Sequence, residues 1–339
     1  MRSLLFGTLF AIASAGSPAL AQPVEFGVNT KYDQGATGPA TIDRIRDVGV
    51  TINRDAVNWQ TVETAAGGLV WPARYTSLYA ALGNRGIRST VILTTRNTRY
   101  DNGRFPTSPA AVAAYARFAA FAARTLGRSA IAFEIGNEFR PSEGVSGMTT
   151  SRDYVTLFVA AANAIHAVDP AAKVVADPAI FANAPATVPL EAGTPIGDAA
   201  RQALQVADGV VVHQYPYQFA GVTLAQAQSA MVAAMTRRAA WLEALAGRPI
   251  PLYVTEYGWP RIAARGLSGQ EQARQLAATT RALAAMPFVR VAIVYELADS
   301  CTDPGNIECT FGLYARGPKG LVAKPVMAAF RGAVAAAAR

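Results

Sequence analysis

The stretch AIAFEIGN, residues 130–137, shows the pattern that decides the fold of this chain. It is an almost unbroken apolar run that ends in polar residues, and Glu138 comes directly after it. Strands that are covered on both faces have this composition, as the strands of a parallel sheet do. Seven similar runs occur along the chain, separated by longer amphipathic stretches. The eight predicted strands are Val24–Asn29, Thr51–Asp55, Arg88–Thr95, Ala130–Asn137, Lys173–Pro178, Gly209–Tyr215, Pro251–Tyr257 and Arg290–Glu296.

The stretches between these strands begin and end as helices do. Ser108 stands before a proline at a predicted first helical position, and residues 223–226 and 268–271 read as capping boxes. Eight strand-then-helix units predict an α/β fold, a single (β/α)8 TIM barrel. A doubly wound open sheet is the alternative, but no G-x-G-x-x-G comes after the first strand. No linker or change of composition divides residues 22–339, so we expect one barrel domain there.

The first 21 residues have the composition of a secretory signal peptide. Arg2 precedes an apolar run over residues 4–15, and Ala19-Leu20-Ala21 supplies an A-x-A cleavage site. A membrane anchor is the alternative, but the apolar run is too short to span a bilayer and ends at Gly16 and Pro18. We therefore expect cleavage after Ala21, a secreted or periplasmic protein, and no membrane span in the remaining chain.

The composition is that of a globular protein, with 51% hydrophobic and 16% charged residues. Lys and Arg total 31 against 23 Asp and Glu, which gives a formal net charge of +8, or +7 without Arg2. The basic residues are scattered singly along the chain, so we predict no nucleic-acid-binding stripe. The sequence gives no sign of an obligate protein partner.

The two cysteines, Cys301 and Cys309, lie eight residues apart in a segment rich in Pro, Gly, Asp and Asn. In an exported protein such a pair predicts a disulfide that closes one loop. A metal site would need more ligands, and the two histidines, His166 and His213, lie far away in sequence. We therefore predict neither a metal nor a cofactor.

Polar and aromatic residues gather where the predicted strands end. In a parallel barrel these ends meet at one face, and the active site lies there. Scattered burial would not produce such a bias, so the pattern predicts a catalytic mouth. The residues in question are Asn29, Arg54, Asp55, Thr94, Thr95, Arg96, Asn97, Asn137, Glu138, Asp177, His213, Gln214, Tyr215, Glu256, Tyr257, Tyr295 and Glu296.

Two of these residues, Glu138 after strand four and Glu256 at the end of strand seven, point to sugar chemistry. Two carboxyl groups across one cleft can cleave a glycosidic bond, one donating a proton while the other attacks or steadies the sugar cation. Asn137, directly before Glu138, offers an amide to a sugar 2-hydroxyl. Two aromatic residues, Tyr257 and Trp259, come soon after Glu256. The sequence therefore indicates a glycoside hydrolase.

These motifs resemble the glycoside hydrolases of clan A. Asn137-Glu138 and Glu256 are similar to the acid/base and nucleophile motifs of that clan, and residues 53–63, NRDAVNWQTVE, resemble its second unit. The similarity spans most of residues 22–339. Among clan members, the chain most resembles the family thirty-nine group and its exopolysaccharide-cleaving bacterial relatives.

The resemblance implies a role for each carboxylate. Glu138 would protonate the leaving oxygen and later deprotonate water, a role that favours a pKa raised toward neutrality. Glu256 would be the nucleophile, kept ionised by the guanidinium of Arg54 and the hydroxyl of Tyr215. Glu134, deeper in the barrel, is expected to be a structural, hydrogen-bonded carboxylate.

The resemblance also implies substrate contacts. His213 and Tyr215 resemble the substrate-contacting pair at the end of the clan's sixth strand, although a buried structural role is the alternative for His213. Trp259 is expected to be a sugar platform. Strand eight departs from the clan, because Tyr295-Glu296 stands where a Trp is usual. We expect Tyr295 to be a smaller platform and Glu296 a different polar contact.

The sequence therefore predicts a secreted retaining β-glycoside hydrolase that cleaves a β-linked polysaccharide or oligosaccharide by double displacement. Endo action is expected, because no obvious second domain closes off an exo pocket. A transglycosylase, in which a sugar replaces water, is one alternative. A non-catalytic carbohydrate-binding barrel is another, which the presence of both glutamates disfavours.

Overall fold

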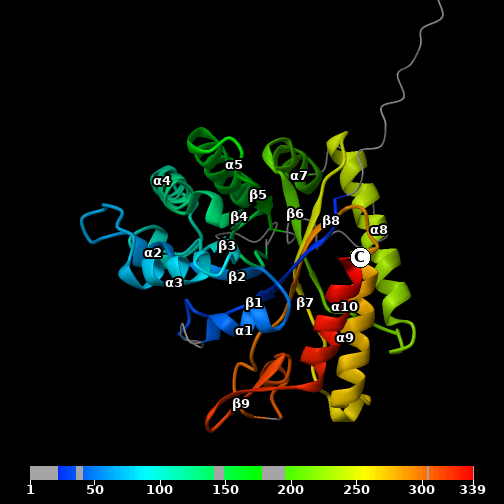
Figure 1. The fold of residues 1–339 in the computed structure, drawn as a ribbon. Coiled ribbons are helices and arrows are strands. Elements are labelled where there is room, and N and C mark those ends of the chain that lie inside the picture. Colours follow the sequence, from blue (N-terminus) through cyan, green and yellow to red (C-terminus); the bar gives the residue numbers. More distant parts are fainter. Residues whose placement is uncertain (1–21, 36–40, 141–148, 178–194, 304, 339) are drawn as a thin grey trace, which may run out of the picture.

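The computed structural model describes residues 22–35, 41–140, 149–177, 195–303 and 305–338. The predicted signal peptide lies outside these ranges, as does Pro178 at the end of predicted strand five. Eight parallel strands pair in chain order and close into a barrel (Figure 1), so the predicted (β/α)8 fold is confirmed. The strands are β1 (Glu25–Asn29), β2 (Ile52–Val57), β3 (Arg88–Leu93), β4 (Ala130–Ile135), β5 (Val174–Ala176), β6 (Gly209–Gln214), β7 (Leu252–Tyr257) and β8 (Val289–Val294).

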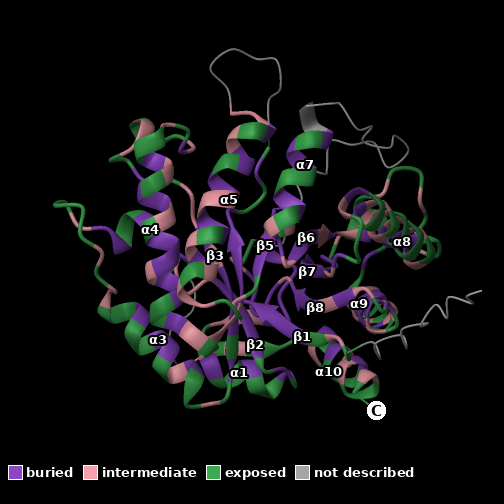
Figure 2. Cartoon of the chain, turned by 90° about the horizontal axis from the view of Figure 1, so that it is seen from above, coloured by how far each residue is buried: buried purple, intermediate pink, exposed green. Residues whose placement is uncertain are grey.

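Helices surround the barrel and expose only their outer faces (Figure 2). The buried residues of these helices recur three or four positions apart, as an amphipathic helix on a sheet requires. The described helices are α1 (Ile42–Asp47), α2 (Trp59–Val62), α3 (Ala73–Gly83), α4 (Pro109–Leu126), α5 (Ser151–Val168), α7 (Pro195–Val206), α8 (Ala227–Ala246), α9 (Gly269–Ala284) and α10 (Pro325–Ala337).

The predicted capping residues begin their helices, with one exception. The side chain of Ser108 accepts a hydrogen bond from Ala111 N at the start of α4, and Ser268 caps α9 in the same way. The predicted box over residues 223–226 does not begin α8. Thr223 bonds to the Gln226 side chain there, but this closes a turn before the helix starts at Ala227.

One half of the barrel interior is apolar and tightly filled. Its buried side chains are Ile52, Ala132, Val175, Val211, Tyr253, Val291 and Ile293. At Gly27 a Cβ atom would lie 2.5 Å from Ile293 Cδ1 and 2.8 Å from the carbonyl oxygen of Ile52, so only glycine fits. Successive side chains of a strand alternate in direction. Arg54 and Glu134, two residues beyond Ile52 and Ala132, therefore enter the same interior nearer its carboxyl end.

The segment after β8 forms an extra structure at the barrel mouth. It contains a short hairpin, β9 (Tyr314–Gly317) and β10 (Gly320–Ala323), before α10 packs beside α9 (Figure 1). A disulfide joins Cys301 to Cys309, as the sequence predicts.

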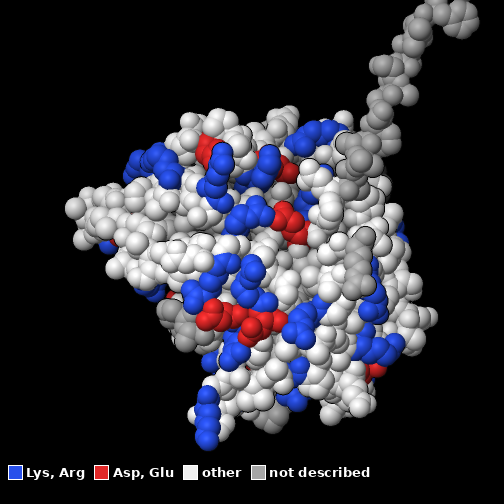
Figure 3. Space-filling model, viewed as in Figure 1, with Lys and Arg blue, Asp and Glu red and all other residues white. Residues whose placement is uncertain are grey.

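Charges of both signs are mixed on the surface. On the face shown in Figure 3, acidic side chains lie among the Lys and Arg residues rather than apart from them. Among the described helices, none has an apolar stretch long enough to cross a bilayer.

Candidate active site

Arg54 lies at the centre of the polar half of the barrel. It comes from β2, is 1% exposed, and donates to two carboxylates. Its Nε lies 2.8 Å from Glu134 Oε1 and its Nη1 lies 2.7 Å from Glu256 Oε1. Its Nη2 also donates to Asn137 Oδ1, at 2.7 Å. Burial opposes the charge of Arg54, but the two carboxylates outweigh it and raise the pKa of the guanidinium. Arg54 therefore links strands β2, β4 and β7.

An extra residue in β7 turns Glu256 into the barrel. Between the pairs Val254–Ala292 and Tyr257–Val294, β7 advances by three residues while β8 advances by two. The pairing with β6 shifts in the same place. Tyr253 points inward, so strict alternation would put Thr255 inside and Glu256 outside. The bulge reverses this, as bulges beside active sites often do.

Glu256 is held as an ionised carboxylate. Besides the bond from Arg54, its Oε2 accepts a bond of 2.5 Å from Tyr215 Oη, and His213 Nδ1 lies 3.6 Å from the same oxygen. Burial alone would raise the pKa of Glu256. The charges of His213 and Arg54 and the Tyr215 bond outweigh it, so the pKa lies below its usual range. The structure thus brings together the partners that were predicted for this glutamate.

Glu138 lies on a tight turn at the end of β4. Gly136 and Glu138 both have left-handed backbone, with φ of +80° and +50°. This conformation is unusual for a glutamate and costs about 1–2 kcal/mol. Asp177, at the end of β5, accepts a hydrogen bond of 3.0 Å from Phe139 N and fixes the next peptide. The turn exposes Glu138, whose side chain is 47% exposed, to the mouth.

His213 bridges the two glutamates. Its Nδ1 lies 3.0 Å from Glu138 Oε1. One carboxylate oxygen of Glu138 and one of Glu256 lie within 4.8 Å of each other. The carboxyl groups of retaining glycosidases are about 5–5.5 Å apart, whereas those of inverting enzymes are about 6.5–9.5 Å apart. The observed geometry fits the retaining arrangement.

The pKa of Glu138 differs from expectation. It is lowered rather than raised, chiefly because Glu138 accepts the hydrogen bond from His213, and burial opposes this only in part. Burial lowers the pKa of His213, but the negative charge of Glu256 and the bond to Glu138 raise it overall. An ionised carboxylate has only acceptors, so His213 Nδ1 holds the proton between the two groups.

Two predicted substrate contacts are contradicted by the structure. Trp259 is 1% exposed, and its indole Nε1 donates to Thr279 Oγ1 on α9 at 2.8 Å, so its ring offers no platform. The buried residues of α9 include the polar side chains Gln272 and Gln275 as well as Thr279. Glu296 is 2% exposed, and its two oxygens bind other side chains of the protein.

Tyr295 lies at the mouth, as predicted. The side chain that holds it there, Lys31, was not predicted from the sequence. The ring is half-buried and meets Tyr215 edge-on, with 6.2 Å between ring centroids. Lys31, from the segment after β1, donates to Tyr295 Oη at 2.9 Å and pairs with Glu296 at 3.0 Å. Lys31 lies two residues beyond predicted strand one, and no motif marks it.

Glu134 has the structural role that was expected, because both of its oxygens accept bonds from Arg54. Among the residues that the structure describes, Glu138, His213 and Glu256 form the one group with the composition of a metal site. The adjacent positive charge of Arg54 disfavours a second cation beside Glu256. The group is therefore better suited to acid–base and nucleophilic chemistry than to binding a metal.

The barrel and its paired glutamates define a retaining glycoside hydrolase of clan A. Residues 15–286 match the model of one family in this class, described as cellulase, glycosyl hydrolase family 5, and the chain belongs to that family. The resemblance to clan A is thereby confirmed. Among curated proteins, none matches the sequence.

Solved structures share the fold at low sequence identity. A family 39 glycoside hydrolase from Bacteroides cellulosilyticus WH2 is 21% identical, with a TM-score of 0.70 over 92% of this chain and 64% of that one. GH5_18 from Streptomyces cattleya in complex with GlcNAc is 18% identical, with a TM-score of 0.70 over 94% and 81%. A monomeric β-xylosidase from Caulobacter crescentus CB15 is 18% identical, with a TM-score of 0.62 over 91% and 68%. The chain thus spans about two thirds of the length of some of these proteins.

Proposed function

We propose that this chain is an exported β-glycoside hydrolase that works by double displacement, with Glu256 as nucleophile and Glu138 as acid/base. The observation that supports this most directly is the pairing of the two glutamates. Their oxygens approach within 4.8 Å, while only Glu256 carries the Arg54 and Tyr215 bonds that keep a nucleophile ionised.

In the first step, a Glu256 oxygen bonds to the anomeric carbon as the glycosidic bond breaks. The departing oxygen takes a proton from Glu138. We propose that this proton comes from protonated His213, whose Nδ1 lies 3.0 Å from Glu138 Oε1. The pKa of His213 is raised overall by Glu256 and Glu138, which favours its charged form and so the supply of this proton.

In the second step, Glu138 removes a proton from water, and the water oxygen bonds to the anomeric carbon. The bond between the sugar and Glu256 breaks, and the carboxylate returns to Arg54 and Tyr215. Asn137 contributes to both steps. Its Oδ1 is occupied by Arg54, so its amide nitrogen is the donor that a sugar 2-hydroxyl would meet.

The substrate we propose is a β-linked polysaccharide cleaved internally. The described residues include no further domain over the mouth. One structural neighbour, from Opitutaceae bacterium strain TAV5, is named an exo-β-1,4-mannosidase. Release of single sugars is therefore the alternative to be tested. Export is supported by the Cys301–Cys309 disulfide, because structural disulfides persist in oxidising compartments.

The test is a screen of residues 22–339 against envelope and plant β-glycans, with products resolved by mass and their anomeric configuration measured by NMR. We expect retained configuration and oligosaccharide products. Glu256→Ala should abolish turnover, whereas Glu243→Ala, which removes an exposed glutamate of α8, should not change it. Inverted configuration, or turnover that survives Glu256→Ala, would refute the mechanism. Glycan binding without turnover would favour a binding protein, and accumulation of longer chains a transglycosylase.

A further inference from the structure

The hydroxyl of Tyr295 is held from two sides. Lys31 Nζ donates to it at 2.9 Å, and the hydroxyl donates to Glu308 Oε2 at 3.1 Å. Its donor and one acceptor site are thus engaged by protein groups. What Tyr295 can offer to a sugar is therefore its ring.

Lys31 is itself fully occupied. An ammonium has three donors, and Lys31 uses them on Tyr295 Oη, Ser300 Oγ at 2.5 Å and Glu296 Oε2 at 3.0 Å. Ser300 donates in turn to Glu296 Oε1 at 2.7 Å. The Lys31 side chain is only 18% exposed and its charge is matched by Glu296, so it is built to hold neighbours rather than a ligand.

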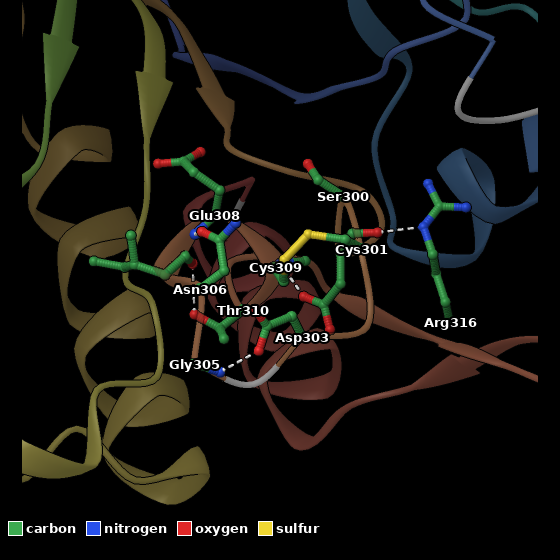
Figure 4. Close-up of a disulfide and its surroundings, with 12 residues drawn as sticks. Ser300, Cys301, Asp303, Gly305, Asn306, Glu308, Cys309, Thr310 and Arg316 are labelled. Atoms are coloured by element: carbon green, nitrogen blue, oxygen red, sulfur yellow. Dashed lines mark hydrogen bonds between the residues drawn. A yellow bond between two sulfur atoms is a disulfide. The ribbon is translucent and has the colours of Figure 1, made fainter.

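The disulfide loop supplies two of these contacts. Ser300 and Glu308 are the residues immediately before Cys301 and Cys309. Figure 4 shows both side chains projecting to the same side of the loop, away from Asp303. The disulfide therefore fixes the distance between the group that binds Lys31 and the group that binds Tyr295.

The position of the ring beside the reaction centre makes this arrangement relevant to function. Tyr295 packs edge-on against Tyr215, the residue that donates to Glu256. Phe311, which is buried, packs against both rings, with centroids 5.3 Å from Tyr295 and 5.7 Å from Tyr215. A shift of the Tyr295 ring would change the wall of the site next to the nucleophile.

We propose that Lys31, Glu296, Ser300, Glu308 and the Cys301–Cys309 disulfide form a clamp that positions the Tyr295 ring as a wall of the substrate site. We call this group the Tyr295 clamp. Lys31 is a positioning residue in it, acting through Tyr295. The inference rests on the proposed function for its effect on glycan turnover, but not for the placement of the ring.

The test compares Lys31→Met with a matched control, Lys324→Met. Lys324 also forms a buried ion pair, with Asp299 at 2.9 Å, and also contacts the disulfide loop, through the carbonyl oxygen of Thr310. No contact with Tyr295 is described for it. Because loss of one hydrogen bond changes an equilibrium by about fivefold, we expect Lys31→Met to raise KM about fivefold while kcat stays within about twofold. Lys324→Met should leave KM unchanged.

Two further variants separate the clamp from general destabilisation. Adding Lys31→Met to Tyr295→Phe should raise KM no further than Tyr295→Phe does alone, because the hydroxyl through which Lys31 acts is already absent. The double variant Cys301→Ser/Cys309→Ser should raise KM in the same direction without touching Lys31. If Lys31→Met does not fold, the double cysteine variant serves as the test in its place. The proposal would be overturned if Lys31→Met and the cysteine variant both kept the wild-type KM. An equal rise of KM in the Lys324→Met control would overturn it as well.

An NMR measurement that needs no glycan cleavage tests the Tyr295 clamp independently of the proposed function. With ¹³C-labelled tyrosine, the aromatic NMR signal of Tyr295 can be assigned by its loss in Tyr295→Phe. It should move in Lys31→Met and in the cysteine variant, but not in Lys324→Met. If the wild-type protein cleaves no glycan, the proposed function fails while this measurement still decides the clamp. An unmoved signal would refute the clamp even in an active enzyme.

Discussion

Replacing Arg54 by methionine should be one of the most damaging changes to the stability of this protein. The variant keeps most of the length of the side chain but removes the guanidinium, which is 1% exposed and bonds to Glu134, Glu256 and Asn137. Two carboxylates would then remain buried without their cation. Removing one partner of a buried ion pair costs about 3–5 kcal/mol, a large part of a typical stability of about 5–15 kcal/mol.

The assay is urea unfolding at pH 7, with the free energy of unfolding extrapolated to water. Adding Glu134→Gln to Arg54→Met removes one uncompensated charge and should recover about 1–3 kcal/mol. The surface pair Arg274–Glu271, whose arginine is 63% exposed, provides the control. Arg274→Met should change the stability far less than Arg54→Met does, because solvent screens an exposed pair. The reasoning would be refuted if Arg54→Met lowered the free energy of unfolding by less than about 1 kcal/mol, or if Glu134→Gln recovered none of the loss. Either result would show that Arg54 does not stabilise the protein by compensating buried charge.

Three other predictions concern the two glutamates and their support. Glu256→Ala with added azide should give a product of inverted configuration. Glu138→Ala should stall after the first step on aryl glycosides with acidic leaving groups, and added azide should then give a product of retained configuration. If the two azide products were exchanged, the roles assigned to the two glutamates would be reversed. The pKa values of Glu138 and Glu256 are lowered, so their contribution to stability is present above the unfolded value of about 4.3 and is lost as pH falls through the folded values. Urea titrations from about pH 6 down to about pH 3 should therefore show a shallower fall in stability for Glu256→Gln than for wild type, and equal slopes would contradict this. Asp177→Ala leaves the buried N–H of Phe139 without its acceptor, so the free energy of unfolding should fall by about 1–3 kcal/mol. We expect kcat to fall by a larger factor than KM changes, because the turn that carries Glu138 is no longer fixed. A wild-type kcat would argue against a positioning role for Asp177.

The sequence supports prediction of the barrel and of its polar mouth because both depend on repeated local patterns. Continuous apolar runs such as residues 130–135 are typical of strands covered on both faces, and their polar ends must meet when the strands are parallel. The pairing of Arg54 and Tyr215 with Glu256 was predicted from a family resemblance, which carries information about distant contacts that periodicity does not.

The errors concern side chains whose direction depends on irregular backbone or on distant partners. Trp259 lies three residues beyond Glu256, yet its indole donates to Thr279 on α9, and proximity in sequence does not predict that contact. The pKa of Glu138 is lowered by His213, a residue on another strand. Lys31 gains its role only from β1 pairing with β8, which brings it beside Tyr295.

The bulge in β7 means that the direction of Glu256, the proposed nucleophile, depends on how its strand pairs as well as on which residues the strand contains. Between Tyr253 and Tyr257 the chain has one residue more than regular pairing with β6 and β8 would use. A shift by one residue exchanges the two faces of a strand. If residues 252–257 were copied into a barrel whose seventh strand pairs regularly, Glu256 would turn toward the helices and Tyr257 would enter the interior. A transplanted site must therefore keep the bulge, or omit Thr255 so that plain alternation from Tyr253 directs the glutamate inward.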